Sequence, residues 1–402
     1  MQFIVENIAL LSIPLISAVV GWFTNFLAVK MMFYPIKFVG IRPIFGWQGI
    51  IPAKARQMAE IEVELVLGRL LNIREIAGRL DADKITHLIE RRLNQVLKRI
   101  VNDVMQESAP KLWAMLPVQG KNALYKRIEM DIPNVVKKMV HDFQNNIDEI
   151  VDIEEIVVKE LTEDPELINE IFLKAGAEEF PFIIKSGAYF GFLFGLVTMM
   201  LWYFYPIWWI LPVGGLVVGY ATNWIALHII FEPKHPKVIG PIKIQGMFLK
   251  RQNEVSRVYA ELIQKKLINA QVITKAIVHG SGSAQLLELI ELHVNDAIDR
   301  YINVALPYFT LGVGSESYYK MKQLSAQRIF EDSEKFLLYT HDYANEALNI
   351  EADLREKMQG LSPEDFEGVL RPAYQQDEWK LIVIGSLLGA VAGVGQLYLM
   401  GM

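Results

Sequence analysis

Two stretches of sequence decide the fold, because each reads as a membrane-spanning helix and one repeats the other. Residues 14–35 read PLISAVVGWFTNFLAVKMMFYP, and residues 212–233 read PVGGLVVGYATNWIALHIIFEP. The leading Pro, the Val-Val-Gly and Thr-Asn runs, the Ala, the Phe and the closing Pro recur at a constant separation of 198 residues. Each stretch has about the 20 apolar residues that a bilayer crossing needs. The chain therefore contains at least two related transmembrane helices.

Three segments of the chain contain no Lys or Arg, and these segments hold all the long apolar runs. No Lys or Arg precedes Lys30, none lies between Lys185 and Lys234, and none follows Lys380. The middle segment is interrupted by Tyr-Pro at 205–206, which suits two helices joined by a tight turn. Mean hydropathy is +0.23 with only 21% charged residues, as expected when apolar residues are concentrated in spans. We predict four transmembrane helices, at 4–33, 186–204, 207–231 and 381–400.

The same charges predict the orientation of the chain. Four spans place residues 36–185 and 234–379 on one side and both termini on the other. Every Lys and Arg close to a span end lies on the side of these two inserts. Cytoplasmic loops carry the excess of positive charge. We therefore expect a multi-pass protein of the bacterial cytoplasmic (inner) membrane with cytoplasmic inserts and extracytoplasmic N- and C-termini.

The repetition extends beyond the membrane, so the chain is predicted to be a tandem duplication. Glu64-Leu65 recurs as Glu261-Leu262, and Asp152-Ile153-Glu154 as Asn349-Ile350-Glu351, at a separation of 197 residues. Repeat A is predicted at 1–204 and repeat B at 205–402, each a span, an insert of about 150 residues and a second span. Because each repeat crosses the membrane twice, the two have one orientation, and the pseudo-twofold axis runs along the membrane normal.

The inserts are predicted to be helical, which makes the whole fold all-α. Apolar residues follow 3-and-4 spacing from Ile85 to Val104 and again from Val135 to Phe143. Asn72 and Asp152 open capping boxes, and Asp164 and Ser362 stand before a proline as N-cap residues. Such stripes are typical of helices that pack into a dry core. A groove or tube that holds lipid, and a stripe lying on the membrane surface, remain the alternatives.

The repeated Thr-Asn pairs are the most specific polar feature of the spans. Small residues and the Asn side chain fall on one face of each helix. Small residues allow a second helix to approach closely, and the Asn amide can then form a hydrogen bond to that helix. This pattern predicts a helix–helix clasp, with a polar path or binding site between the repeats as the functional alternative. Pro14 and Pro212 are expected to interrupt the helical hydrogen bonds of both spans at equivalent depths in the membrane. This expectation favours the polar path or binding site. The candidate intramembrane polar and packing site consists of Ser17, Gly21, Thr24, Asn25, Ala28, Gly215, Gly219, Thr222, Asn223, Ala226 and Gln396.

No motif for chemistry is found in the sequence. The absence of Cys excludes disulfides and thiolate chemistry, and the seven His residues form no metal-ligand spacing. There is no phosphate-binding loop, nucleophile elbow or dinucleotide fingerprint. A net charge of −6 disfavours nucleic acid as a partner. No catalytic, cofactor-binding or metal-binding residue is predicted, and no enzymatic activity.

Motifs near both ends resemble those of a known family. They are Gly21-x-x-Thr24-Asn25-x-x-Ala28 near the start and, near the end, Ser362 to Glu367, Leu370 to Tyr374, Asp377 to Ile382 and Gly385-x-x-x-Gly389. The chain resembles domain of unknown function 445, a bacterial family of multi-pass membrane proteins that includes the UPF0754 membrane proteins. The resemblance implies a location in the bacterial cytoplasmic membrane and brings no established activity or cofactor.

Two classes of function follow from these observations. The large helical inserts favour a membrane-anchored scaffold or a lipid-handling module, with the lipid bilayer as its first partner. A phospholipid ligand and a protein partner on the cytoplasmic side both stay open. The alternative is a transporter or channel whose polar path lies between the repeats at the Thr-Asn motifs.

Overall fold

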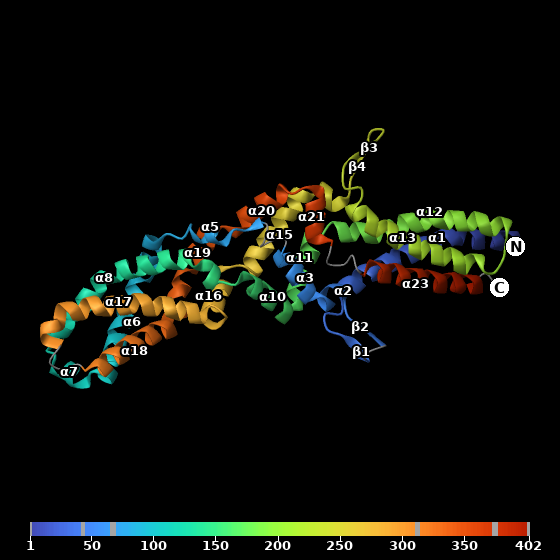
Figure 1. Cartoon of the computed structure of the whole chain (residues 1–402). Coiled ribbons are helices and arrows are strands. Elements are labelled where there is room, and N and C mark those ends of the chain that lie inside the picture. The colour runs from blue at the N-terminus through green and yellow to red at the C-terminus, as the bar shows by residue number, and fades with distance from the viewer. Residues whose placement is uncertain (1, 42–44, 65–69, 310–313, 372–376, 400–402) are drawn as a thin grey trace. The chain divides into compact units, whose positions relative to one another are not determined.

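The structure is a computed structural model that describes residues 2–41, 45–64, 70–309, 314–371 and 377–399. It is predominantly helical, and the chain forms two compact units that are described separately (Figure 1). Unit 1 comprises Met1–Leu70, Val158–Ile263 and Leu354–Met402, and unit 2 comprises Leu71–Val157 and Gln264–Asp353. Each unit therefore takes segments from both halves of the chain, a different division from the repeats 1–204 and 205–402.

Unit 1 contains the four long apolar helices, two β-hairpins and several short helices. Its elements are α1 (Gln2–Phe33), β1 (Val39–Ile41), β2 (Phe45–Trp47), α2 (Ile50–Ala53), α3 (Ala55–Glu62), α11 (Pro165–Ala175), α12 (Glu179–Phe204), α13 (Ile210–Phe231), β3 (Lys237–Ile239), β4 (Ile242–Ile244), α14 (Met247–Lys250), α21 (Pro363–Leu370) and α23 (Glu378–Leu399). Three helices, α10 (Ile153–Glu163), α15 (Gln252–Lys266) and α20 (Ile350–Gln359), contribute residues to both units.

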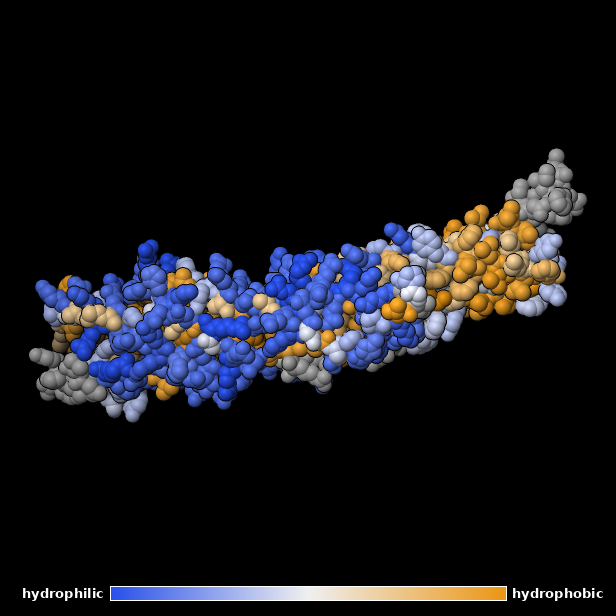
Figure 2. Space-filling model, turned by 90° about the horizontal axis from the view of Figure 1, so that it is seen from above, coloured by the Kyte–Doolittle hydropathy of each residue, from blue (hydrophilic) through white to orange (hydrophobic). Residues whose placement is uncertain are grey.

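Four helices are long and apolar enough to cross a membrane, as the sequence predicts. These candidate spans are Leu10–Phe33, Glu179–Phe204, Ile210–Phe231 and Glu378–Tyr398. The second helix begins seven residues before the predicted start at 186, and its first residue, Glu179, is buried and pairs with Arg251. The predicted end of the last span at Met400, and Pro372, Ala373 and Tyr374 of the family motif, lie outside the described residues. On the face shown in Figure 2, apolar side chains cover much of the surface at the end of the molecule where these helices lie.

The two hairpins are a departure from the all-α prediction. β1 pairs antiparallel with β2, and β3 with β4, each over three residues. Strands this short carry too few residues to produce a recognisable alternation of apolar and polar positions. Both hairpins directly follow an apolar helix, after α1 and after α13.

Two ion pairs tie the start of each insert to a membrane helix of the other half. Lys54 Nζ lies 2.8 Å from Asp377 Oδ2, next to the start of α23, and Arg251 Nη1 lies 2.7 Å from Glu179 Oε1, at the start of α12. Lys54 and Arg251 are 197 residues apart, so equivalent cations bind acids of the opposite half. The Glu179 side chain is fully buried, so the pair with Arg251 places a charged contact inside unit 1.

Unit 2 is a bundle built mainly from four long helices. Its elements are α5 (Ile73–Ala77), α6 (Ala82–Ser108), α7 (Pro110–Met115), α8 (Val118–Asn145), α9 (Ile147–Ile150), α16 (Ala270–His279), α17 (Ser283–Phe309), α18 (Ser315–Leu337), the 3₁₀ turn η2 (Leu338–Thr340) and α19 (His341–Leu348). α6 packs against α8 and α18, and α17 packs against α18 and α8. One core cluster gathers Ile100, Val104 and Trp113 of the first half with Met321 of the second.

The predicted helix caps are confirmed. Asn72 Oδ1 accepts a hydrogen bond from the Glu75 amide, and Asp152 Oδ1 accepts one from the Glu155 amide. Asp164 and Ser362 cap the helices that begin with the following prolines. Local sequence is sufficient to fix these helix starts, because a cap needs only residues within one turn.

Candidate functional site

The first Thr-Asn motif lies at the contact between α1 and α12. Asn25 is fully buried, and its Nδ2 donates a hydrogen bond to the carbonyl oxygen of Ile183 at 2.7 Å. A Cβ atom added to Gly21 or to Gly187 would clash with the carbonyl oxygen of the other. The Thr24 hydroxyl donates to the carbonyl of Gly21 within its own helix, at 3.1 Å. The glycines allow the close approach that lets the amide reach the neighbouring backbone.

The second motif forms the same contact between α13 and α23. Asn223 Nδ2 donates to the carbonyl oxygen of Leu381 at 2.8 Å, again with 158 residues between donor and acceptor. Gly219 lies against Gly385 with no room for a Cβ on either residue. The Thr222 hydroxyl donates to Val218 of its own helix. Asn25 therefore links α1 to α12, and Asn223 links α13 to α23. The carboxamide oxygen of each asparagine has no hydrogen-bond partner among the described residues.

Three other residues of the predicted site lie around one small pocket. Ser17, Gly215 and Gln396 line a space of about 10 Å³ together with Thr198. Gln396 is buried, and its Nε2 has no hydrogen-bond partner among the described residues. The volume matches a single water molecule, which is the smallest guest that a polar pocket holds.

The proline argument for a polar path is wrong for one of the two helices. Pro14 lies inside α1, but Pro212 is the third residue of α13. Backbone N–H groups in the first turn of a helix have no intrahelical acceptor, so a proline there breaks no bond of the ladder. The two helices therefore differ at this position. Of the remaining site residues, Ala226 is buried and Ala28 is partly buried.

A large cavity lies inside unit 2 and is apolar. It has a volume of about 370 Å³. The long helices α6, α8, α17 and α18 supply most of its wall, and Leu93, Val136 and Ile290 are among the buried side chains that face it. On α6 the lining runs from Ile85 to Val101, which corresponds to about 24 Å of helix. Its size falls within the range of ligand pockets.

A few polar groups interrupt the apolar wall. His341 Nε2 and Thr274 Oγ1 lie 3.0 Å apart, and both side chains are buried. Burial lowers the pKa of His341 below 6.5, although the charges of Asp342 and Glu334 act in the opposite direction. The ring is therefore neutral at physiological pH. No Lys, Arg, Asp or Glu of the described residues lines the cavity.

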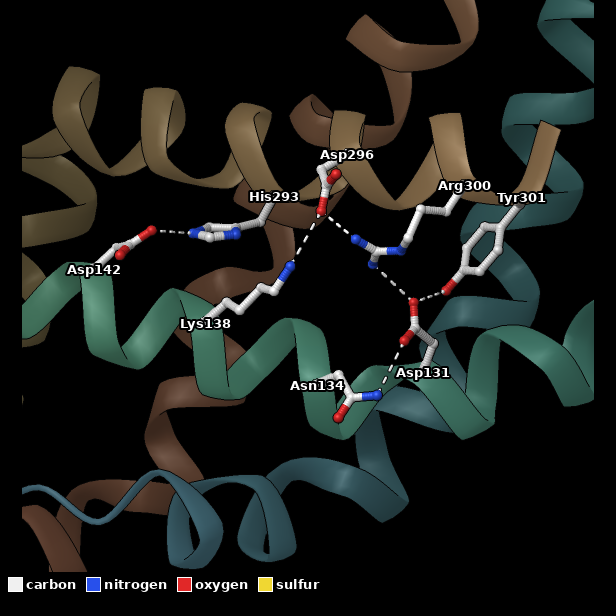
Figure 3. A network of polar contacts seen from close by, with 8 residues as sticks. All are labelled: Asp131, Asn134, Lys138, Asp142, His293, Asp296, Arg300 and Tyr301. Atoms are coloured by element: carbon white, nitrogen blue, oxygen red, sulfur yellow. Dashed lines mark hydrogen bonds and ion pairs between the residues drawn. The ribbon is translucent and has the colours of Figure 1, made fainter. Parts of the chain in front are cut away.

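A polar network joins α8 to α17 beside this cavity (Figure 3). Asp131 Oδ2 accepts hydrogen bonds from Arg300 Nη2 at 2.9 Å and from the Tyr301 hydroxyl at 2.8 Å. Asp296 pairs with Arg300 and lies 3.5 Å from Lys138 Nζ. The network fixes helices from the two halves of the chain against each other along one side of the cavity.

The same contacts shift the ionisation of two groups. Burial raises the pKa of the Asp131 carboxyl, but hydrogen bonds from Arg300, Tyr301 and Asn134 and the charge of Arg300 outweigh it, so the pKa lies below 3.8. Burial and the bond to Asp131 raise the pKa of Tyr301. Asp131 is therefore ionised and Tyr301 neutral at physiological pH.

The sequence identified one wall of the cavity and missed the other. Ile85, Ile100, Val136 and Phe143 belong to the stripes noted above and line the cavity. The apolar stripes did not point to the opposing residues of α17 and α18. Adding the separation of 197 to 201 residues between the two halves to the first-half positions would have located them. In the described part of the chain, no group of three His, Asp or Glu side chains is placed to hold a metal ion.

These features define a class: a membrane protein with four candidate spans and a helical unit that surrounds an apolar cavity. No family model and no solved structure matches the chain. UPF0754 membrane proteins do match: that of Microcystis aeruginosa is 33% identical over 109 residues, covering 26% of each chain. The protein of Trichodesmium erythraeum is 26% identical over 153 residues, which cover 33% of this chain and 36% of the relative. The protein of Cyanothece sp. is 28% identical over 125 residues, which cover 25% of this chain and 31% of the relative.

These matches support the assignment of the chain to the UPF0754 membrane protein family, in agreement with the resemblance noted in the sequence. The alignments span only 26% to 36% of the length of these three relatives. Their names describe membrane proteins and state no activity.

Proposed function

We propose that this protein is a membrane-anchored lipid-handling protein whose helical unit 2 holds an apolar chain. The observation that carries the proposal is the cavity of about 370 Å³, whose wall contains no charged side chain of the described residues. Four helices that could span a membrane would anchor the chain that carries this cavity in a lipid bilayer. A scaffold role needs helical surfaces but gives no reason for an internal space.

The energetics of an empty cavity support an occupant. Substitutions that open unfilled space in an apolar core are destabilising, because the surrounding side chains lose contacts that nothing replaces. Water is a poor substitute, because it needs several polar partners and stays out of apolar cavities. An acyl chain fills the space with the dispersion contacts that the wall lacks when empty.

The test is to purify the full chain in mild detergent, extract it with organic solvent and identify bound lipids by mass spectrometry. A narrowed-cavity variant, Ala297→Trp, replaces a buried lining residue of α17 with a much larger side chain that takes up part of the space. Leu292→Trp is the matched control, because Leu292 lies on the same helix and is 60% exposed. We expect the wild type and Leu292→Trp to retain about one lipid per protein, and Ala297→Trp to retain clearly less while it stays folded.

A folded wild-type protein that carries no lipid, or an Ala297→Trp variant that retains as much lipid as the control, would contradict the proposal. Either result would leave the scaffold function as the better explanation. Scaffolding would then be tested by cross-linking the protein in membranes, where a protein partner on the cytoplasmic side is expected.

A transporter or channel is the second candidate function, and one observation favours it. Gln396, Ser17 and Thr198 place polar groups together inside the bundle of apolar helices. Against it, the Asn25 and Asn223 amides are engaged by backbone carbonyls, and the glycine contacts leave no space between the helices of each pair.

We also propose that the chain is a tandem duplication with its inserts in the bacterial cytoplasm. Support comes from contacts that recur in both halves: the two asparagine bonds, the two hairpins, and the hydrogen bonds from Gln48 and Gln245 to the carbonyls of Ile36 and Lys234. The pseudo-twofold axis along the membrane normal and the inner-membrane location belong to the same proposal.

A further inference from the structure

The two halves of the chain contribute equivalent positions to the cavity wall but different chemistry. Positions 128 and 136 on α8 correspond to 325 and 333 on α18 at the separation of 197 residues, and all four line the cavity. Residues 128 and 136 are Ile and Val, whereas residues 325 and 333 are both Ser. Phe143 and Thr340, also 197 residues apart, line the cavity as well, and again the first-half residue is apolar and the second-half residue carries a hydroxyl.

This difference holds for the whole described lining. Every lining residue between 71 and 157 is apolar. The polar ones all come from the second half: Thr274, Tyr301, Ser325, Ser333, Thr340 and His341. The few polar groups of this largely apolar cavity therefore all lie on the wall that the second half supplies.

One of these hydroxyls is buried and free. Thr274 and His341 bond to each other, Tyr301 donates to Asp131, and Thr340 donates to the carbonyl of Leu337. Ser333 is 7% exposed, and its Oγ has no hydrogen-bond partner among the described residues. A buried hydroxyl without a partner is unfavourable, so a polar atom of the occupant is expected beside it.

The wall also restricts the charge of the occupant. No Lys or Arg of the described residues lines the cavity. An ionised carboxylate or phosphate placed there would lose its hydration without gaining a counter-charge. The polar group beside Ser333 must therefore be neutral.

From these features we infer that the cavity takes a single-chain neutral lipid, with its chain on the apolar wall and a hydroxyl or carbonyl oxygen accepting a hydrogen bond from Ser333 Oγ. The inference rests on the proposed function and specifies its ligand. The lining of about 24 Å along α6 suits one long chain in an extended form. No charged side chain of the described lining is available to bind the headgroup of a phospholipid.

The test compares three probes on the full chain, delipidated and held in an amphipol: 1-hexadecanol, hexadecane and palmitate at pH 8. Binding is measured by displacement of a fluorescent apolar dye. We expect 1-hexadecanol to bind about fivefold more tightly than hexadecane, the factor that corresponds to one net hydrogen bond of about 1 kcal/mol. Palmitate, ionised at this pH, is expected to bind more weakly than both.

Three variants assign the difference to Ser333. Ser333→Ala should bring the affinity for 1-hexadecanol down to that for hexadecane, and Ser333→Thr, which keeps a hydroxyl, should restore most of the preference. Val136→Ala, at the corresponding position of the apolar wall, should weaken both probes by the same factor.

The outcomes separate this inference from the proposed function. If no probe binds the wild type, the proposed function itself fails. If 1-hexadecanol and hexadecane bind equally, if Ser333→Ala keeps the preference, or if palmitate binds most tightly, the cavity still holds a chain but the inference about its polar group is wrong.

Discussion

Two asparagines in apolar helices have the same contact in both halves of the chain. Asn25 and Asn223 each donate to a backbone carbonyl of a neighbouring helix, at 2.7 and 2.8 Å. An amide in hydrocarbon needs such a partner, and the carbonyls of Ile183 and Leu381 provide it. At the scale of the residue, the geometry fits a clasp between helices better than a site that awaits a ligand.

The double variant Asn25→Leu/Asn223→Leu is expected to lose about 1–2 kcal/mol of stability, since measured hydrogen bonds between membrane helices average about 0.6 kcal/mol and reach about 1.7. Thermal unfolding in detergent measures the loss, and Val19→Leu, at a position that is 64% exposed, serves as the control. Unchanged stability together with loss of solute flux in proteoliposomes would instead identify a polar path.

Asp131 is a second residue whose contacts lead to a prediction, this time on pH. Its pKa is lowered in the folded protein, so its ionised form stabilises the fold above about pH 4, and this contribution is lost as the pH falls through the folded pKa. Asp131→Asn should cost about 2 kcal/mol at pH 7, the value typical of hydrogen bonds to a charged group. The variant should also lose less stability than the wild type between pH 4 and pH 2.

Denaturant melts of the full chain, followed at several pH values, measure both effects. Asp148→Asn is the matched control, because Asp148 pairs with Arg74 in a contact where both side chains are more than half exposed. An equal acid sensitivity of the wild type and Asp131→Asn would show that the network in Figure 3 does not contribute.

At the scale of the elements, each insert is fastened to the span of the opposite half by an ion pair. The Arg251–Glu179 pair is the more buried, with 20% and 0% of the side chains exposed, against 24% and 10% for Lys54–Asp377. Removing one partner of a buried pair leaves an uncompensated charge, whereas removing both is far less costly.

Arg251→Ala is therefore expected to destabilise the protein by about 3–5 kcal/mol. Adding Glu179→Gln to this variant should recover a large part of that loss. Arg56→Ala, in an exposed pair with Glu60, should change the stability by less than about 1 kcal/mol. Chemical unfolding of the four proteins measures these values, and a double variant as unstable as Arg251→Ala would argue against coupling.

At the scale of the whole molecule, the distribution of basic residues leads to a prediction about topology. Fusions after Gly49 and Gly246 place a reporter within each insert, next to the basic residues that flank the spans. We expect an export-dependent phosphatase to be inactive at both sites and a cytoplasmic fluorescent reporter to be active. A fusion at residue 206, between the second and third spans, is the internal control and should give the opposite pattern. An active phosphatase after either glycine would overturn the orientation.

The sequence by itself determined the features that depend on neighbours along the chain. Hydropathy located four span helices to within a few residues at most ends, and caps such as Asn72 and Ser362 located helix starts. Spacing alone placed Asn25 on the same face as Gly21. Each of these features depends on groups within a few turns of one helix, which is the range that a local pattern reports.

Only the tertiary structure decided which segments meet and what lies between them. It paired α1 with α12 and α13 with α23, and it brought Lys54 to Asp377. An apolar stripe shows that a helix face avoids water, but the same stripe suits a filled core and the wall of a cavity. The volume left between α6, α8, α17 and α18, and the free hydroxyl of Ser333 facing it, depend on how side chains from segments some 200 residues apart fit together, and no local pattern records that fit.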